Sequence, residues 1–135
     1  MASIKGRNTK PEMVLRKALF SLGLRYRLHQ KRLPGTPDLV FRKHNAVIFI
    51  HGCFWHGHQC KLFVVPATHT KFWVQKIAGN RSRDGHAVEL LQTMGWRVMT
   101  VWECAVRGHD RVPIEMLATT IRRWLNTKKS LGELP

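Results

Sequence analysis

The sequence predicts a single α/β domain in which helices cover both faces of a mixed β-sheet. Three segments with strand character follow a first helical segment, and then a helix, a fourth strand and a last helix alternate along the chain. Strands in succession, followed by a helix and one more strand, favour a sheet with antiparallel and parallel pairs. The 135 residues suffice for one domain with a hydrophobic core, and we see no repeat or linker, so residues 1–135 are expected to form one unit.

The first helix is expected to begin at Thr9. Threonine is a good N-cap, Pro11 fits the first turn, and Glu12 stands three residues after the cap, where a capping-box residue belongs. Gly23 is a natural end for this helix. Apolar residues recur at helical spacing between these points: Val14, Leu15, Ala18, Leu19 and Leu22.

Three short strands are expected after this helix. Residues 24–30 alternate weakly between apolar and polar side chains, and the Pro/Gly cluster at 33–37 must end that strand. Residues 38–41 form the next strand, and a polar turn at 43–45 leads into residues 46–50. This last run, Ala-Val-Ile-Phe-Ile, is entirely apolar, which is typical of a buried central strand.

The middle of the chain predicts a helix in two parts. Thr70 is expected to cap a helix over residues 71–77. Gly79 and Gly85 are expected to interrupt it, because glycine is a poor helix former. The helical pattern then resumes over residues 88–94.

The last strand and the last helix are well marked. Residues 97–102 have the character of another buried strand, and Glu103 and Cys104 follow it directly. Pro113 opens an amphipathic helix. Its apolar positions are Ile114, Leu117, Ile121, Trp124 and Leu125.

The net charge of +15, from 23 Lys and Arg against 8 Asp and Glu, predicts an anionic partner, with nucleic acid first and an anionic membrane surface second. The basic residues are spread along the chain, which favours a folded basic surface over a disordered tail. Five tryptophans add stacking capacity, and filling the core is their alternative use. Without a secretory signal or a membrane span, and with only three cysteines, we expect a cytoplasmic protein with reduced thiols.

Residues 51–60, His-Gly-Cys-Phe-Trp-His-Gly-His-Gln-Cys, hold three histidines, two of the three cysteines and an aromatic pair. Cys53, His58 and Cys60 lie within eight residues, and Cys104 follows a strand that can lie beside this segment. Three cysteines and one histidine are a ligand set for a closed, tetrahedral zinc site of structural type. The alternative is three unrelated buried thiols, which a loop so rich in polar residues and glycine disfavours.

Asp38 stands out because it is one of only 8 acidic residues and begins a strand beside the one that ends at His51. That layout is common in Mg-dependent nucleases, and hard cations prefer oxygen ligands. The alternative for Asp38 is a carboxylate that stabilises the preceding turn. Glu12 and Asp84 are weaker candidates, with a capping residue and a loop charge as alternatives. His51 and His56 are candidate proton-transfer groups, because the zinc ligand set does not need them.

Five short motifs carry a family resemblance. They are Pro37-Asp38-Leu39-Val40, Val47-Ile48-Phe49-Ile50-His51-Gly52-Cys53-Phe54-Trp55-His56, Val65-Pro66-Ala67-Thr68, Gly95-Trp96-Arg97-Val98 and Val101-Trp102-Glu103-Cys104. This pattern resembles the very-short-patch repair (Vsr) endonucleases, over nearly the whole chain. The resemblance implies a restriction-endonuclease-like fold with an α-β-β-β-α-β core. It also implies an enzyme that nicks double-stranded DNA 5′ to the thymine of T:G mismatches, which arise when 5-methylcytosine is deaminated.

The resemblance implies roles for individual residues. The expected active-site residues are Asp38, Ile50 through its backbone carbonyl, His51, His56, Asp84 and Glu12. Asp38 and the Ile50 carbonyl are expected to hold a catalytic Mg²⁺, with His56 as the general base and Asp84 orienting a histidine. The expected ligands of a structural Zn²⁺ are Cys53, His58, Cys60 and Cys104. The aromatic side chains expected to wedge into the duplex beside the mismatch are Phe54, Trp55 and Trp73.

The resemblance further implies a monomer, associated with the nucleoid in the bacterial cytoplasm, whose partners are T:G-mismatched DNA and mismatch-repair proteins. Common restriction-type nucleases carry a second acidic residue and a lysine where this chain has Phe49-Ile50-His51, a departure that Vsr enzymes share. Family members usually have a longer basic arm before the region matching Lys5, so we expect weaker mismatch binding here with little change in catalysis. Two alternatives stay open: a related homing or restriction-associated nuclease with another target, and a zinc-stabilised DNA-binding module without catalysis.

Overall fold

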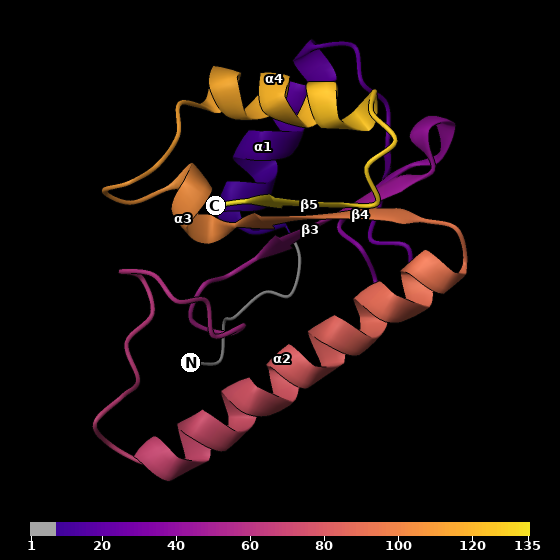
Figure 1. The fold of residues 1–135 in the computed structure, drawn as a ribbon. Helices are drawn as coiled ribbons and strands as arrows, with labels where there is room; N and C mark the ends of the chain where they lie inside the picture. The colour runs from indigo at the N-terminus through magenta and orange to yellow at the C-terminus, as the bar shows by residue number, and fades with distance from the viewer. Residues whose placement is uncertain (1–7) are drawn as a thin grey trace.

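A five-stranded mixed sheet forms the centre of the computed structural model, which describes residues 8–135 (Figure 1). The strands lie side by side in chain order: β1 (Arg27–Leu28), β2 (Leu39–Phe41), β3 (Ala46–His51), β4 (Arg97–Trp102) and β5 (Leu131–Leu134). The first three pair antiparallel, whereas β3, β4 and β5 pair parallel. The predicted mixed sheet is confirmed. The expectation about a basic arm before Lys5 lies outside the described residues.

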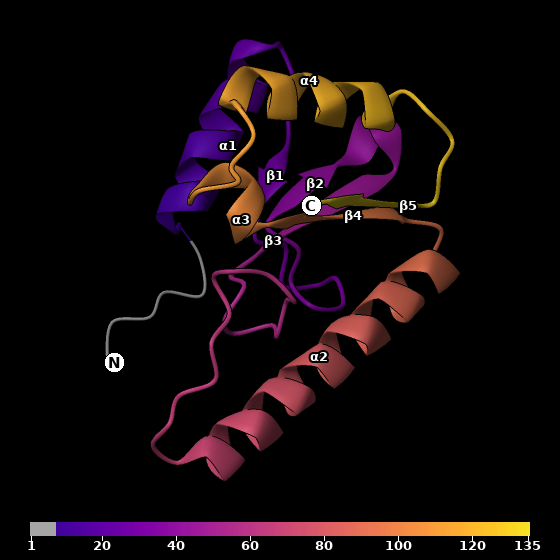
Figure 2. The ribbon, with the colours of Figure 1, turned by 60° about the vertical axis from the view of Figure 1, so that its left-hand side comes forward.

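Helices cover both faces of the sheet, as predicted. Figures 1 and 2 show α1 (Lys10–Ser21) and α4 (Ile114–Leu125) on one face and the long α2 (Thr70–Thr93) on the other. Successive side chains of a strand point to opposite faces, so the strands contribute to two cores. The core under α1 and α4 includes Leu15, Leu19, Phe41, Ile48, Leu117 and Ile121. The smaller core under α2 consists of Val40, Val47, Phe49, Leu91 and Val98.

The start of α1 agrees with the sequence, but its capping differs in one detail. Thr9 is the N-cap and accepts a hydrogen bond from the backbone N–H of Glu12 at 3.5 Å. The Glu12 carboxylate accepts from the backbone N–H of Asn8 at 2.9 Å, and not from that of Thr9. The reciprocal capping box is therefore incomplete, and Glu12 remains buried with other partners.

The expected break in the second helix is wrong. α2 runs through Gly79 and Gly85 without interruption, over 24 residues. A glycine within a helix costs about 1 kcal/mol, and the burial of Ile77, Ala87 and Leu91 outweighs this cost. Thr70 is not the N-cap either, because its hydroxyl donates to backbone carbonyls of the preceding loop. Among residues 8–135, no helix has both the length and the hydrophobicity to cross a membrane.

Two elements were not expected, and one strand is shorter than expected. Cys104 lies in the short helix α3 (Glu103–Val106), directly after β4. β5 is a short edge strand that pairs with β4, and its four residues are too few to reveal a strand pattern in the sequence. β1 covers only Arg27–Leu28 of the predicted residues 24–30, because the backbone of His29 turns into the left-handed region at φ 45°.

The turn cluster at residues 33–37 packs against α2 and delivers Asp38 to the sheet. Gly35 has φ +74°, and a Cβ there would lie 2.8 Å from the Cβ of Ala87 on α2. Only glycine allows this close approach. The Pro/Gly pattern of the sequence therefore reflects contact with the second helix as well as a change of direction.

Candidate active site and metal-ligand cluster

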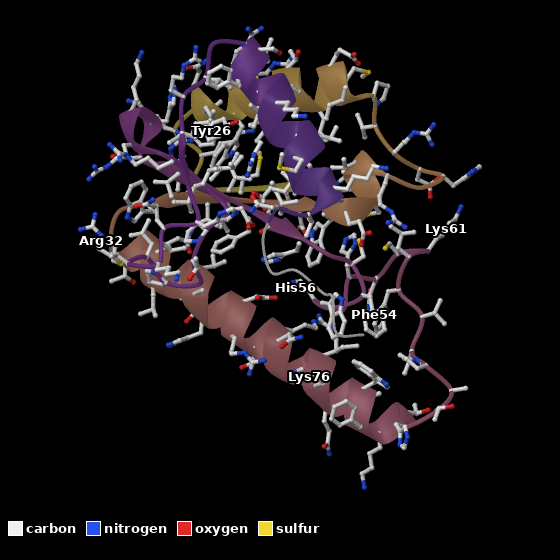
Figure 3. All side chains as sticks on the ribbon, turned by 180° about the vertical axis from the view of Figure 1, so that it is seen from behind. Tyr26, Arg32, Phe54, His56, Lys61 and Lys76 are labelled. Atoms are coloured by element: carbon white, nitrogen blue, oxygen red, sulfur yellow. The ribbon has the colours of Figure 1, made fainter. Side chains whose placement is uncertain are left out.

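A pocket of about 300 Å³ lies between the sheet and α2. It is lined by Gly35, Thr36, Asp38, Phe49, Ile50, His51, His56, Arg83, Asp84 and Ala87. Five of the six predicted active-site residues are among these, and they come from the start of β2, the end of β3, the following loop and α2. Figure 3 shows His56 between the sheet and the helix. We call the set Asp38, Ile50, His51, His56 and Asp84 the histidine pocket.

Asp38 is a buried carboxylate in a site suited to a cation. Only 8% of its surface is exposed, and its Oδ2 accepts a hydrogen bond from the backbone N–H of Ile50 at 2.7 Å. Burial raises the pKa of Asp38 to about 7, and the nearby Glu12 charge adds to this. A carboxylate that is hard to ionise without a counter-charge gains strongly from a bound cation. The donor set therefore fits a hard divalent metal.

His56 and Asp84 form a close pair across the pocket. The Nδ1 of His56 lies 2.5 Å from Oδ2 of Asp84. A carboxylate accepts hydrogen bonds, so the proton of the ring sits on Nδ1 and Nε2 is left free to accept a proton. This pairing orients a general base. Asp84 lies within α2, so it is not the loop charge considered as its alternative.

His51 is held as a neutral ring beside His56. The two imidazoles are stacked, with their centroids 3.8 Å apart and their planes at 5°, and the ring of Trp102 packs edge-to-face with His51 at a centroid distance of 5.4 Å. Burial, and next the neighbouring His56, lowers the pKa of His51 to about 3. His51 therefore stays neutral when His56 takes up a proton, so the stacked rings do not repel each other.

Glu12, the sixth predicted residue, does not line the pocket. It lies behind Asp38, where its Oε2 is 2.8 Å from Nε2 of His29. Glu12, His29 and Asp38 bring ligand atoms within 4.8 Å of one another. Sequence reasoning missed His29, because it belongs to a segment that has the pattern of an ordinary strand. The available signal for a functional role of this histidine was its position shortly before the turn cluster at residues 33–37.

The four predicted zinc ligands converge at one point. Cys53, His58, Cys60 and Cys104, which we call the cysteine cluster, place their ligand atoms within 4.8 Å of one another. The Nδ1 of His58 lies 3.6 Å from the Sγ of Cys53 and 3.5 Å from that of Cys104. Zinc bonds of about 2.3 Å to sulfur and about 2.05 Å to nitrogen, at a tetrahedral angle, place such atoms about 3.6 Å apart. The cluster therefore fits zinc, and three unrelated thiols are excluded.

The groups around the cysteine cluster support thiolate ligands. Backbone N–H groups point at sulfur: that of Cys104 at Cys53 Sγ, 3.3 Å away, and that of Leu62 at Cys60 Sγ, 3.4 Å away. The ring of Trp102 stacks on that of His58 at 4.1 Å and fixes its orientation. Burial raises the pKa of the Cys53 and Cys104 thiols, so thiolates at these positions need a cation.

The predicted wedge residues, Phe54, Trp55 and Trp73, form an aromatic cluster near the start of α2. Their ring centroids lie 5.0 to 5.6 Å apart, with edge-to-face geometry. All three are half-buried, and none belongs to either hydrophobic core. The neighbouring side chain of Phe72 is 58% exposed. Figure 3 shows Phe54 on the same side of the sheet as α2. The cluster is therefore a separate aromatic surface.

Comparison with known proteins agrees with this geometry. The profile of the family described as "DNA mismatch endonuclease Vsr" matches residues 1–62. The chain is 46% identical over 125 residues to the DNA mismatch endonuclease Vsr of Escherichia coli, covering 93% of this chain and 80% of that protein. It is 47% identical over 104 residues to the type II nicking enzyme V.XorIIP of Xanthomonas oryzae pv. oryzae, covering 77% and 76%. It is 45% identical over 108 residues to the type II nicking enzyme V.NmeAIP of Neisseria meningitidis, covering 80% and 77%.

Identity extends over most of this chain and of its relatives. The family profile covers every residue of the histidine pocket except Asp84, and every residue of the cysteine cluster except Cys104. The chain belongs to the Vsr DNA mismatch endonuclease family.

Proposed function

We propose that this endonuclease nicks double-stranded DNA 5′ to the thymine of T:G mismatches, with Mg²⁺ as the catalytic metal. The observation that carries the proposal is the histidine pocket, where a buried carboxylate, a neutral histidine and an Asp–His pair meet. Phosphodiester hydrolysis needs a cation at the phosphate, a base for the attacking water and help for the leaving oxygen. The pocket offers a carboxylate to hold the cation and a histidine to take the proton of the water.

Asp38, with the backbone carbonyl of Ile50, would hold the Mg²⁺. When bound, Mg²⁺ polarises the scissile phosphate and stabilises negative charge on its oxygens. His56 takes a proton from the attacking water at Nε2, while Asp84 holds Nδ1 and stabilises the imidazolium. The P–O3′ bond breaks as the new P–O bond forms, and the departing O3′ takes a proton from a water molecule. His51 remains neutral and lies close enough to His56 to bind the reacting phosphate beside it.

The two remaining clusters have supporting roles in this proposal. Zn²⁺ in the cysteine cluster ties the loop that carries His56 to the end of β4, through Cys104. The aromatic cluster inserts into the duplex at the mismatch, because a T:G pair unstacks at lower cost than a Watson–Crick pair. The net charge of +15 supplies phosphate contacts that do not read sequence. We further propose that residues 1–135 act as one domain and as a monomer.

A second function is supported by the names of the relatives. Two of those described above are type II nicking enzymes. The same pocket would then cut one strand at a defined DNA sequence, and the mismatch would not be required.

One experiment distinguishes the two functions. Purified protein with Mg²⁺ is incubated with duplexes that carry T:G or T:A at one position between randomised flanks, and nicked strands are sequenced. We expect nicks 5′ to the thymine in T:G duplexes only, and none with Asp38→Ala, which should still bind the duplex. Equal nicking of matched duplexes would favour the second function. Nicking by Asp38→Ala at the wild-type rate would contradict the assigned metal ligand.

A further inference from the structure

His29 lies directly behind the proposed metal ligand and contacts it through its backbone. Its N–H donates to the carbonyl oxygen of Asp38 at 3.1 Å. Its ring nitrogen Nε2 lies 2.8 Å from Oε2 of Glu12 and 4.0 Å from Oδ1 of Asp38. Only 10% of the His29 side chain is exposed. The ring therefore occupies the space between a carboxylate of α1 and the carboxylate at the start of β2.

The carboxylate of Glu12 is held in place by several hydrogen bonds. Its side chain is 2% exposed. Its Oε1 accepts from the backbone N–H of Asn8 at 2.9 Å, and its Oε2 accepts from Arg16 at 2.8 Å as well as facing His29. A carboxylate with these partners is already compensated and gains little from a metal. It is suited to hold a neighbouring ring in place.

The backbone of His29 is bent to make this contact. Its φ of 45° lies in the left-handed region, which strains the backbone of a non-glycine residue. The same bend ends β1 after Leu28 and turns the chain toward the 33–37 loop. Strain of this kind persists only where surrounding contacts hold it. Here the contacts are the bond to the Asp38 carbonyl and the contact with Glu12.

We propose that His29 is a positioning residue: held by Glu12, it fixes the backbone and the carboxylate of Asp38 in the geometry that the divalent cation requires. The inference deepens the proposed function and rests on it. In this proposal His29 acts on the cation through Asp38 and is not itself a ligand. Its loss should weaken metal binding, because the groups that orient a metal ligand typically contribute 10- to 100-fold to affinity.

The test compares His29→Phe with His29→Gln. Phenylalanine fills the space of the ring but cannot donate to Glu12, whereas glutamine keeps a donor. His86→Phe is the matched control, because His86 is an exposed histidine on α2. Binding of Mn²⁺, a spin-active substitute for Mg²⁺, is measured by electron paramagnetic resonance on zinc-loaded protein, with Asp38→Ala as the zero reference. Single-turnover nicking is titrated with Mg²⁺, and DNA affinity is measured without divalent cation.

We expect His29→Phe to weaken Mn²⁺ binding and to raise the half-saturating Mg²⁺ concentration by about tenfold or more. DNA affinity without metal should be unchanged, His29→Gln should stay within about threefold of the wild type, and His86→Phe should not differ. Unchanged Mn²⁺ affinity in a folded His29→Phe protein would overturn the inference. Equal losses in the Phe and Gln variants would overturn it too, because His29 would then be a ligand. A wild-type protein that binds Mn²⁺ but nicks no duplex would instead overturn the proposed function.

Discussion

The histidine pocket and the cysteine cluster both adjoin the end of β3, yet their geometry suits opposite purposes. His51 ends β3 and Cys53 follows two residues later, while Trp102 ends β4 and Cys104 lies two residues beyond. Trp102 touches both sites, with its edge toward His51 and its face on His58. The two sites are therefore neighbours that share one wall.

Donor chemistry and openness separate the two sites. The cysteine cluster gathers three sulfurs and one nitrogen at distances that fit four-coordinate zinc, so no position is left for substrate. The histidine pocket offers one buried carboxylate and histidines around an open volume of about 300 Å³. A closed site with sulfur and nitrogen ligands stabilises the fold, whereas an open site with oxygen ligands leaves room for a phosphate and water. Within the single loop after β3, some residues therefore serve stability and others serve chemistry.

The largest effect should come from breaking the closed site. Cys104→Ser should remove zinc and lower the free energy of unfolding by on the order of 5 kcal/mol, because zinc binding contributes directly to folding. Metal analysis and urea unfolding measure both quantities. Asp38→Ala is the matched control: it should keep its zinc and its stability while losing nicking. If the Cys104→Ser protein folds with the stability of the wild type, the cysteine cluster is not a structural zinc site.

The next effect concerns the open site. His56→Ala should slow single-turnover nicking by on the order of a hundredfold at saturating Mg²⁺, the scale of a lost general base. Asp84→Asn should slow it less, by about tenfold, because the base remains but its orientation and charge partner are weakened. His86→Ala, on the exposed side of α2, should leave the rate unchanged. If His56→Ala keeps the rate and pH profile of the wild type, the ring only packs against His51.

A smaller effect should appear as a pH dependence of stability. The pKa of Asp38 is about 7 in the folded protein against 3.8 as its ordinary value, so the folded state retains a proton that the unfolded state has released. Wild-type stability contributed by this group is present at acidic pH and is lost as the pH rises through 7. Asp38→Asn does not titrate, so it should gain about 2 kcal/mol over the wild type between pH 5.5 and pH 8.

The measurement for this prediction is urea unfolding of both proteins without added Mg²⁺. Zinc stays in place, and both proteins share the same cysteine cluster and the same His51, whose contributions therefore cancel in the difference. A stability gap that is the same at both pH values would mean that Asp38 ionises freely in the folded protein.

The smallest effect should come from the aromatic cluster. Trp55→Ala or Trp73→Ala should narrow the affinity gap between T:G and T:A duplexes by roughly tenfold, because stacking of a base on an aromatic ring contributes about 1–3 kcal/mol. Fluorescence anisotropy with both duplexes measures the gap. Phe20→Ala removes an exposed ring from α1, far along the chain from this cluster, and should not change it. An unchanged gap in both tryptophan variants would make these rings structural.

Much of the fold was predictable, because the signals are local. The cap at Thr9, the left-handed glycine at Gly23 and the apolar run at 46–50 each depend on a few adjacent residues. The uninterrupted α2 was not predictable, since helix propensity alone favours breaks at its glycines. Burial against the sheet reversed that preference. β5 was missed for a related reason: each of its residues pairs with a residue of β4 that lies 33 positions earlier in the chain.

The chemical groups of both sites can be identified from the amino-acid sequence alone. Residues 51–60 supply three zinc ligands and both central histidines, and their spacing already separates soft donors from proton carriers. The distant groups that complete each site are identified only by the fold. Cys104 joins the cluster, Asp84 pairs with His56 across 28 residues, and His29 meets Glu12 across 17. Such pairs form because packing on the two faces of the sheet brings helices and loops together. The spacing of residues along the chain does not predict these contacts.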